Sequence, residues 1–198
     1  MGACNRVRNP IVPSSKLSKE KEGAQVDGTL FKQIVGSLIY MIVTRPDLMY
    51  SVCLISRFMS NPMEVHMLAA KTILSYVQAT TDFGILYKRN CTHELMAYTN
   101  SDYARDLSDR KSTSGYVFML SGGAVAWASK KQPVVTLSTT EAEYVAAASC
   151  ACQSVWMQRI WKQIKGTQSK PVKIFCDNSS TIKLAKSQSF MEEINTLM

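Results

Sequence analysis

Three acidic side chains in separate segments of the sequence could do chemistry together. Asp102 lies on an expected strand, Glu143 lies one turn inside an expected helix, and Asp177 follows a later expected strand. Metal-dependent cleavage of a phosphodiester needs carboxylates from different elements that converge on a spot about 4 Å wide. Strand ends and helix starts often meet on one edge of an α/β sheet. The three carboxylates are therefore candidate metal ligands.

Each carboxylate also has a simpler explanation. An acidic residue near a helix start favours the helix dipole, and one at the end of a strand can cap a turn. His66 and His93 have no partner at metal-ligand spacing, so neither is assigned to a metal.

The elements that must position these residues follow from the hydrophobic pattern. Residues 1–28 are polar, without a sustained period, and indicate an extended leader. Helices are expected over residues 30–43, 47–60 and 63–79. In the second helix, Leu48, Val52, Ile55 and Met59 make one apolar face, and in the third the expected face is Val65, Leu68, Ala69, Leu74 and Val77.

After Thr81 the apolar period changes to two, which predicts strands. Strand candidates are residues 83–87, 95–102, 115–120, 124–128 and 171–176. Ser121-Gly122-Gly123 predicts a tight hairpin turn, and Ser138-Thr139-Thr140-Glu141 has the form of a helix capping box. A long helix is expected to run from there to about Ile164, and a shorter one covers about 179–187.

This order of elements predicts an α/β protein: a mixed sheet with flanking helices, preceded by a small helical segment. The expected divisions are an extended leader (1–28), a helical segment (29–81), an α/β domain (82–190) and a tail (191–198).

Composition limits the cellular setting. The chain has 198 residues, 46% of them hydrophobic, which is a globular composition. Its six cysteines form no C-x-x-C pair, so we expect reduced thiols in the cytoplasm or nucleus. The longest apolar run, Ile34–Val43, is about half of the ~20 residues that span a bilayer, and no signal peptide begins the chain. We therefore expect no membrane partner.

The net charge of +8 favours contact with a polyanion. Five basic residues near the expected strand ends could contact nucleic-acid phosphates; a solvated basic surface is the equal alternative. They are Arg105, Arg110, Lys111, Lys130 and Lys131. Trp127, Trp156 and Trp161 are interpreted as packing residues, not as platforms for nucleobases.

Several strings resemble one known family, in the order in which that family has them. The strings are Tyr98-Thr99-Asn100-Ser101-Asp102-Tyr103-Ala104, Arg110-Lys111-Ser112-Thr113-Ser114-Gly115-Tyr116, Leu137-Ser138-Thr139-Thr140-Glu141-Ala142-Glu143-Tyr144 and Phe175-Cys176-Asp177-Asn178. They resemble the ribonuclease H domain of copia-type LTR retrotransposon Pol polyproteins. Upstream, Val35-Gly36-Ser37-Leu38-Ile39-Tyr40 and Thr44-Arg45-Pro46-Asp47 resemble the connection that follows the reverse transcriptase thumb.

The resemblance covers roughly residues 1–190 and implies a fold and an activity. It implies a ribonuclease H-like fold that hydrolyses the RNA strand of an RNA–DNA hybrid with Mg²⁺ or Mn²⁺. Glu143 and Asp177 match the second and third metal-ligand positions of the family. The polymerase palm is expected to lie before Met1.

Two departures from the family pattern bear on activity. The first catalytic aspartate is Asn100 here, and residues 189–195 replace the late aspartate motif, as in a truncated domain. A neutral amide attracts divalent ions less than a carboxylate does. Asp102 lies on the same side of the strand but about 6–7 Å further along it. We therefore expect a degenerate domain that is inactive or nearly so.

Two alternatives to an enzyme stay open. Similar fragments are also catalogued as secreted RxLR effector proteins of oomycetes, which implies a non-enzymatic protein delivered into the host cytoplasm or nucleus and binding a host protein. Neither a secretion signal nor an Arg-x-Leu-Arg string supports this alternative. The second is a pseudogene product without a selected function. No feature of the sequence indicates an oligomeric state.

Overall fold

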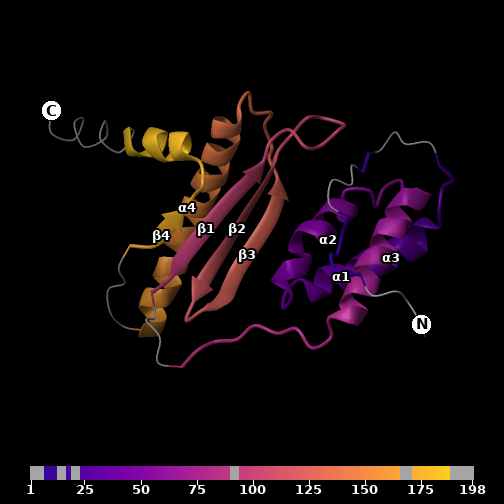
Figure 1. Cartoon of the computed structure of the whole chain (residues 1–198), viewed down its shortest axis with the longest axis horizontal. Helices are drawn as coiled ribbons and strands as arrows, with labels where there is room; N and C mark the ends of the chain where they lie inside the picture. Colours follow the sequence, from indigo (N-terminus) through magenta and orange to yellow (C-terminus); the bar gives the residue numbers. More distant parts are fainter. Residues whose placement is uncertain (1–6, 13–16, 19–22, 90–93, 166–170, 188–198) are drawn as a thin grey trace. The chain divides into compact units, whose positions relative to one another are not determined.

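A computed structural model describes residues 7–12, 17–18, 23–89, 94–165 and 171–187 (Figure 1). The chain divides into two compact units. The first comprises Met1–Ile85 with Asp106–Arg110, and the second comprises Leu86–Arg105 with Lys111–Met198. The sequence had suggested a division after residue 81. The expected tail 191–198 and the replaced motif at 189–195 lie outside the described residues.

Helices α1 (Gly28–Met41), α2 (Met49–Ser56) and α3 (Glu64–Ala79) form the first unit, with a 3₁₀ turn, η1 (Pro46–Leu48), before α2. Helix α1 starts where the Asp27 carboxylate accepts hydrogen bonds from the backbone N–H groups of Thr29 and Leu30. Pro46 opens η1, where its missing N–H costs nothing.

The core of this unit is apolar and contiguous. Each helix contributes its apolar face, and residues of the expected leader also pack here, with Leu17 buried. The buried core residues are Leu17, Phe31, Val35, Leu38, Leu48, Val52, Ile55, Phe58, Met67, Ala70, Ile73 and Tyr76. The face predicted for the second helix is therefore confirmed, with Met59 partly buried against the same core.

The face predicted for the third helix is confirmed for four of its five residues: Val65, Ala69, Leu74 and Val77 are partly buried against this core. The prediction is wrong for Leu68, which is 64% exposed, and the buried side of α3 also carries His66. His66 is tolerated in the core because both ring nitrogens have partners. The Met63 N–H donates to Nδ1 at 3.0 Å, so Nε2 donates to the Ser18 carbonyl at 3.2 Å. The ring also stacks on Phe58.

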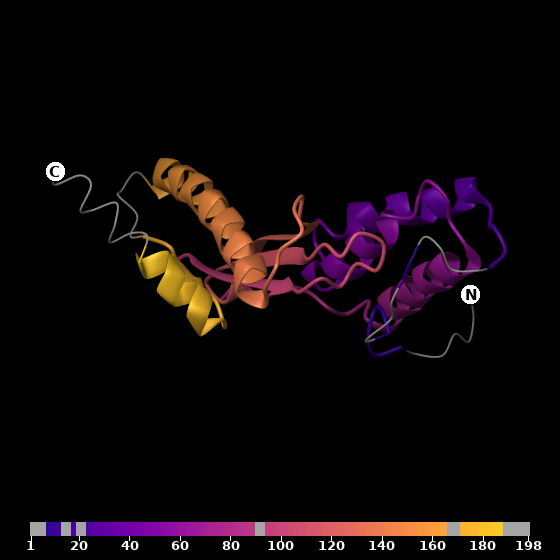
Figure 2. The same cartoon turned by 90° about the horizontal axis from the view of Figure 1, so that it is seen from above.

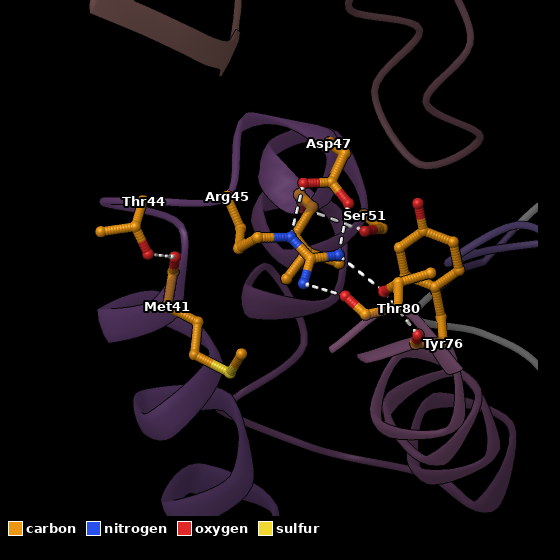
Figure 3. A network of polar contacts seen from close by, with 8 residues as sticks. Met41, Thr44, Arg45, Asp47, Ser51, Tyr76 and Thr80 are labelled. Carbon is orange, nitrogen blue, oxygen red and sulfur yellow. Dashed lines mark hydrogen bonds and ion pairs between the residues drawn. The ribbon is translucent and has the colours of Figure 1, made fainter. Parts of the chain in front are cut away.

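Arg45 links the start of η1 to the end of α3 (Figure 3). Its guanidinium donates to both carboxylate oxygens of Asp47, at 2.9 and 2.7 Å. It also donates to the carbonyl and the hydroxyl of Thr80, at 3.1 and 2.7 Å, and so caps α3. The rings of Tyr76 and Phe83 lie within 6 Å of its charge.

The contact with Arg45 lowers the pKa of Asp47. Partial burial alone would raise the pKa of this carboxyl, but the hydrogen bond and charge of Arg45 hold it below its ordinary value of 3.8. The stabilisation is therefore present at neutral pH and is lost as the pH falls below 3.8 through the lowered value.

Arg45→Lys should destabilise the first unit by about 2 kcal/mol, because a lysine cannot reproduce the planar, bidentate geometry or the second pair of bonds to Thr80. Urea unfolding followed by circular dichroism measures the loss. Lys71→Gln, at an exposed position of α3, is the control and should change stability by less than about 0.5 kcal/mol. Equal stability of the two variants would show that the contacts of Arg45 with Asp47 and Thr80 do not stabilise the first unit.

The second unit is built on a four-stranded mixed sheet with the order β3-β2-β1-β4. Strands β1 (Met96–Asp102), β2 (Thr113–Leu120) and β3 (Gly123–Lys131) are antiparallel neighbours, and β4 (Lys173–Phe175) pairs with β1 in parallel. Helix α4 (Thr139–Lys165) runs alongside the strands (Figures 1 and 2) and buries Cys150 against Ala97 and Phe118. The expected mixed α/β fold is present and is consistent with a ribonuclease H-like fold.

The hairpin turn between β2 and β3 is confirmed. Ser121 and Gly122 both have positive φ, +52° and +81°, as a two-residue type I′ turn requires. Gly123 already pairs with Leu120.

Residues 83–87 form no strand, so that prediction is wrong. Their alternating pattern has no partner strand: Phe83 and Leu86 are 57% and 73% exposed. At the end of the segment, the Tyr87 hydroxyl donates to the Ala124 carbonyl at 2.8 Å. Within the described ranges, no helix has the length and apolar character needed to cross a membrane.

Candidate metal centre

Glu143 is positioned by the start of α4. The Ser138 hydroxyl accepts a hydrogen bond from the Glu141 N–H at 3.1 Å, which confirms the predicted cap. The Glu141 carboxylate accepts from the Leu137 N–H at 2.6 Å and not from Ser138, so the box is closed one residue earlier than the usual pattern. Glu143, two residues further on, is only 7% exposed.

Cys176 and Asp177 are positioned by the end of β4. Because β4 is parallel to β1 and its last residue, Phe175, pairs with Tyr98, the chain leaves β4 beside the second half of β1. Asn178 then caps the helical segment 179–187: its side-chain oxygen accepts from the Thr181 N–H at 3.0 Å. The Thr181 hydroxyl donates to the Thr140 carbonyl at 2.9 Å and ties this segment to the first turn of α4.

These two constraints bring three ligand-type side chains together. One ligand atom of each of Glu143, Cys176 and Asp177 lies within 4.8 Å of the others. Glu143 Oε1 accepts a hydrogen bond from the backbone N–H of Ser101 in β1 at 2.9 Å. The Cys176 thiol lies 4.0 Å from Glu143 Oε2 and donates toward it.

The environment disfavours negative charge at this centre. Burial raises the pKa of Glu143, the Ser101 N–H opposes that shift, and the Asp177 charge adds to it. Burial also raises the pKa of the Cys176 thiol, and the charges of Glu143 and Asp177 add to the shift, while a backbone hydrogen bond at Asn178 opposes it. The thiol is therefore protonated at neutral pH, and the two carboxylates are the available anionic ligands.

The other two residues predicted for the site, Asn100 and Asp102, both lie on β1. Asn100 is exposed on β1, between the buried Thr99 and Ser101, whose N–H meets Glu143. Asp102 ends β1, where its carboxylate accepts a hydrogen bond from the Thr113 N–H of the neighbouring strand. Asp102 is not a member of the group around Glu143.

Cys176 lies beside the two carboxylates but was not among the residues predicted for the site. It stands in the quoted Cys-Asp-Asn string, directly before a candidate ligand at a strand end. That adjacency was the available signal, because two consecutive residues leaving a strand can approach the same edge.

Four of the five predicted basic residues belong to the second unit. Lys131 pairs with Thr113 and Lys130 with Ser114, so both lysines lie at the end of the sheet where β1 finishes. Arg105 and Lys111 lie in the loop between β1 and β2. Arg110 belongs to the first unit and has a left-handed backbone, with φ +55°. Of the tryptophans, Trp127 is half-buried and Trp156 is 52% exposed.

The sequence is similar to several known proteins. It is 38% identical over 191 residues to the retrovirus-related Pol polyprotein from transposon TNT 1-94 of Nicotiana tabacum, and 38% identical over 184 residues to that from transposon RE1 of Arabidopsis thaliana. Each match covers 93% of this chain but only 14% or 13% of the polyprotein. The secreted RxLR effector protein 161 of Plasmopara viticola is 44% identical over 133 residues, which are 67% of this chain and 94% of the effector.

The chain belongs to the retrovirus-related Pol polyproteins of copia-type retrotransposons. It spans about one seventh of the two polyproteins and nearly the whole effector. No family model and no solved structure matches the sequence.

The donor set of this Pol-related centre fits one hard divalent ion. Mg²⁺ and Mn²⁺ favour carboxylate oxygens and are commonly held by one or two carboxylates with water and phosphate completing the shell. Glu143 and Asp177 supply two such groups. Among the described residues, the group contains no third carboxylate that could bridge a second ion.

Glu143→Gln should stabilise the fold at neutral pH by a few degrees in Tm, because the raised pKa means that the ionised carboxylate costs stability. The amide still accepts from Ser101 but carries no charge. The gain should shrink as the pH falls through the raised value and vanish below the ordinary value of 4.5. Thermal unfolding at neutral pH and at a pH below 4.5 measures this difference.

The matched control for that substitution is Glu141→Gln on the same helix. Glu141 is exposed and its charge favours the helix start, so its loss should not stabilise the protein. Identical gains for the two variants, or a gain for Glu143→Gln that is independent of pH, would contradict the electrostatic account.

Proposed function

We propose that the second unit is a ribonuclease H-like domain with a weakened divalent-metal site. Its ancestral reaction is metal-dependent hydrolysis of the RNA strand in an RNA–DNA hybrid. The observation that carries the proposal is the convergence of Glu143 and Asp177, which come from the start of α4 and the end of β4. Kinship with transposon Pol polyproteins supports the same reaction class.

In this proposal, Glu143 and Asp177 would hold one Mg²⁺ or Mn²⁺ ion, which when bound would supply Lewis-acid chemistry for phosphodiester hydrolysis. The Ser101 N–H orients the Glu143 carboxylate. Lys130 and Lys131, at the same end of the sheet, attract the phosphates of the hybrid. Arg105 and Lys111 contribute to the same positive surface, and cleavage does not require a membrane.

Asn100 is the reason why we propose little or no cleavage. A neutral amide stands where relatives of this type carry an anion, so attraction for divalent ions falls. Asp102 does not replace that anion, because its carboxylate accepts the Thr113 N–H and lies outside the ligand group. A displacement of about 1 Å from the productive geometry can cost ~100-fold in rate.

An assay on a labelled RNA–DNA hybrid with Mg²⁺ or Mn²⁺ tests this proposal. The natural chain should cut at or near background, and Asn100→Asp should raise the rate tenfold or more, on the order expected for a restored charged ligand. Glu143→Gln in the Asn100→Asp background is the control that should abolish the gain.

Two results would contradict the proposal in different ways. Robust cutting by the natural chain that disappears in Glu143→Gln would show that Asn100 does not weaken the site. Absence of any gain in Asn100→Asp, with the protein folded, would show that Glu143 and Asp177 no longer form a working centre.

A second candidate function is favoured by the effector match, because the chain covers 94% of that short protein. In that case the chain would act by binding a host protein in the cytoplasm or nucleus of a plant cell, without catalysis. The two candidates differ in the transcript: an upstream exon that encodes a signal peptide would favour the effector, and a continuous polyprotein reading frame would favour the retrotransposon.

A further inference from the structure

Gln132 is a buried side chain that contacts three of the elements around the carboxylate centre: β1, β2 and α4. It directly follows β3 and is 3% exposed. Its side-chain nitrogen donates to the Ser114 hydroxyl of β2 at 2.8 Å, to the Ser101 hydroxyl of β1 at 3.2 Å and to the Ala142 carbonyl of α4 at 2.9 Å. Its backbone N–H donates to the Ser112 carbonyl at 2.8 Å, which fixes the backbone from which the side chain extends.

The contacts of Gln132 with Ser101 and Ala142 lie next to the hydrogen bond between Ser101 and Glu143. Ser101 provides the N–H that Glu143 Oε1 accepts at 2.9 Å, and Ala142 directly precedes Glu143. The side-chain nitrogen of Gln132 therefore contacts both Ser101, which donates to Glu143, and the backbone of Ala142, which is the residue before Glu143. An uncharged amide suits this place, since its two N–H hydrogens are shared among the three acceptors and it adds no charge beside the bond between Ser101 and Glu143.

The other end of the amide distinguishes this contact from ordinary core packing. Gln132 Oε1 is buried and has no hydrogen-bond partner among the residues that the structure describes. A buried carbonyl-type oxygen without a partner costs about 1–3 kcal/mol. An apolar side chain of the same length would avoid that cost but would leave the oxygens of Ser101, Ser114 and Ala142 without this donor. What distinguishes glutamine here is therefore the single donor group that joins β1, β2 and α4.

We propose that Gln132 is a positioning residue that sets the place of the Glu143 carboxylate by clamping Ser101 of β1 to the first turn of α4. The inference rests on the proposed function, in which Glu143 and Asp177 hold a divalent ion. Residues that orient metal ligands through hydrogen bonds commonly change metal affinity by about 10–100-fold when they are replaced. Gln132 makes no contact with the ion in this arrangement and acts only through Ser101 and Ala142.

Gln132→Met in the full chain tests the proposal, because methionine has a similar length and volume but cannot donate. Two readouts are needed: the Mn²⁺ affinity by calorimetry, and the Ser101 amide proton in metal-free protein by NMR. We expect the affinity to fall about tenfold or more. We also expect the Ser101 proton to move upfield and to exchange faster, because its bond to Glu143 loosens.

Tyr87→Phe is the matched control in the same unit. It deletes the hydrogen bond to the Ala124 carbonyl near the hairpin turn, at the opposite end of the sheet. It should lower stability without changing the Mn²⁺ affinity or the Ser101 signal. If Gln132→Met behaves like Tyr87→Phe in both readouts, Gln132 is a structural residue only and the proposal is overturned.

Ser114→Ala is the second variant, for use if Gln132→Met does not fold. It removes the shortest contact of the Gln132 amide without touching Glu143 directly. The Ser101 signal should shift in the same direction by a smaller amount, and an unchanged signal overturns the proposal. If the natural chain does not bind Mn²⁺, the proposed metal function fails, and the Ser101 signal of the variants alone decides the role of Gln132.

Discussion

Two carboxylates held close together on a half-buried sheet edge are the constraint on which the second unit depends. Glu143 and Asp177 have ligand atoms within 4.8 Å, and burial together with their mutual repulsion raises the pKa of Glu143. Like charges at this distance stay together only when the surrounding structure compels it. The compelling contacts are the Ser138 cap of α4, the parallel pairing of β4 with β1, and the bond from Thr181 to Thr140.

A cation would repay that cost, which connects the stability of the fold to its ancestral chemistry. Two further side chains, Asn100 and Cys176, affect how strongly the centre would attract a cation. Asn100 removes an anion from the family's pattern, and the protonated Cys176 adds a donor that is poor for hard ions. In the proposed function, Glu143 and Asp177 are the two ligands that the tertiary fold brings together, and the neutral side chain of Asn100 in β1 supplies no further anion.

The sequence was sufficient for features set by local chemistry. Ser121-Gly122 predicted a turn because both residues tolerate positive φ, and Ser138 predicted a helix start because its hydroxyl can cap. Features decided by distant partners were missed. His66 is buried on α3 because Ser18 and Met63 satisfy its ring, and no period of apolar residues reveals that. Residues 83–87 alternate like a strand but have no neighbour to pair with, and the role of Gln132 depends on three elements that meet only in the folded chain.

The most direct test of the account is calorimetric titration of the natural chain with Mn²⁺ at neutral pH, beside Asp177→Asn. The account predicts weak binding of one ion by the natural chain, and about tenfold weaker binding or none by the variant. Equal binding by the two proteins, or no binding by either, would contradict the claim that Glu143 and Asp177 form a metal centre.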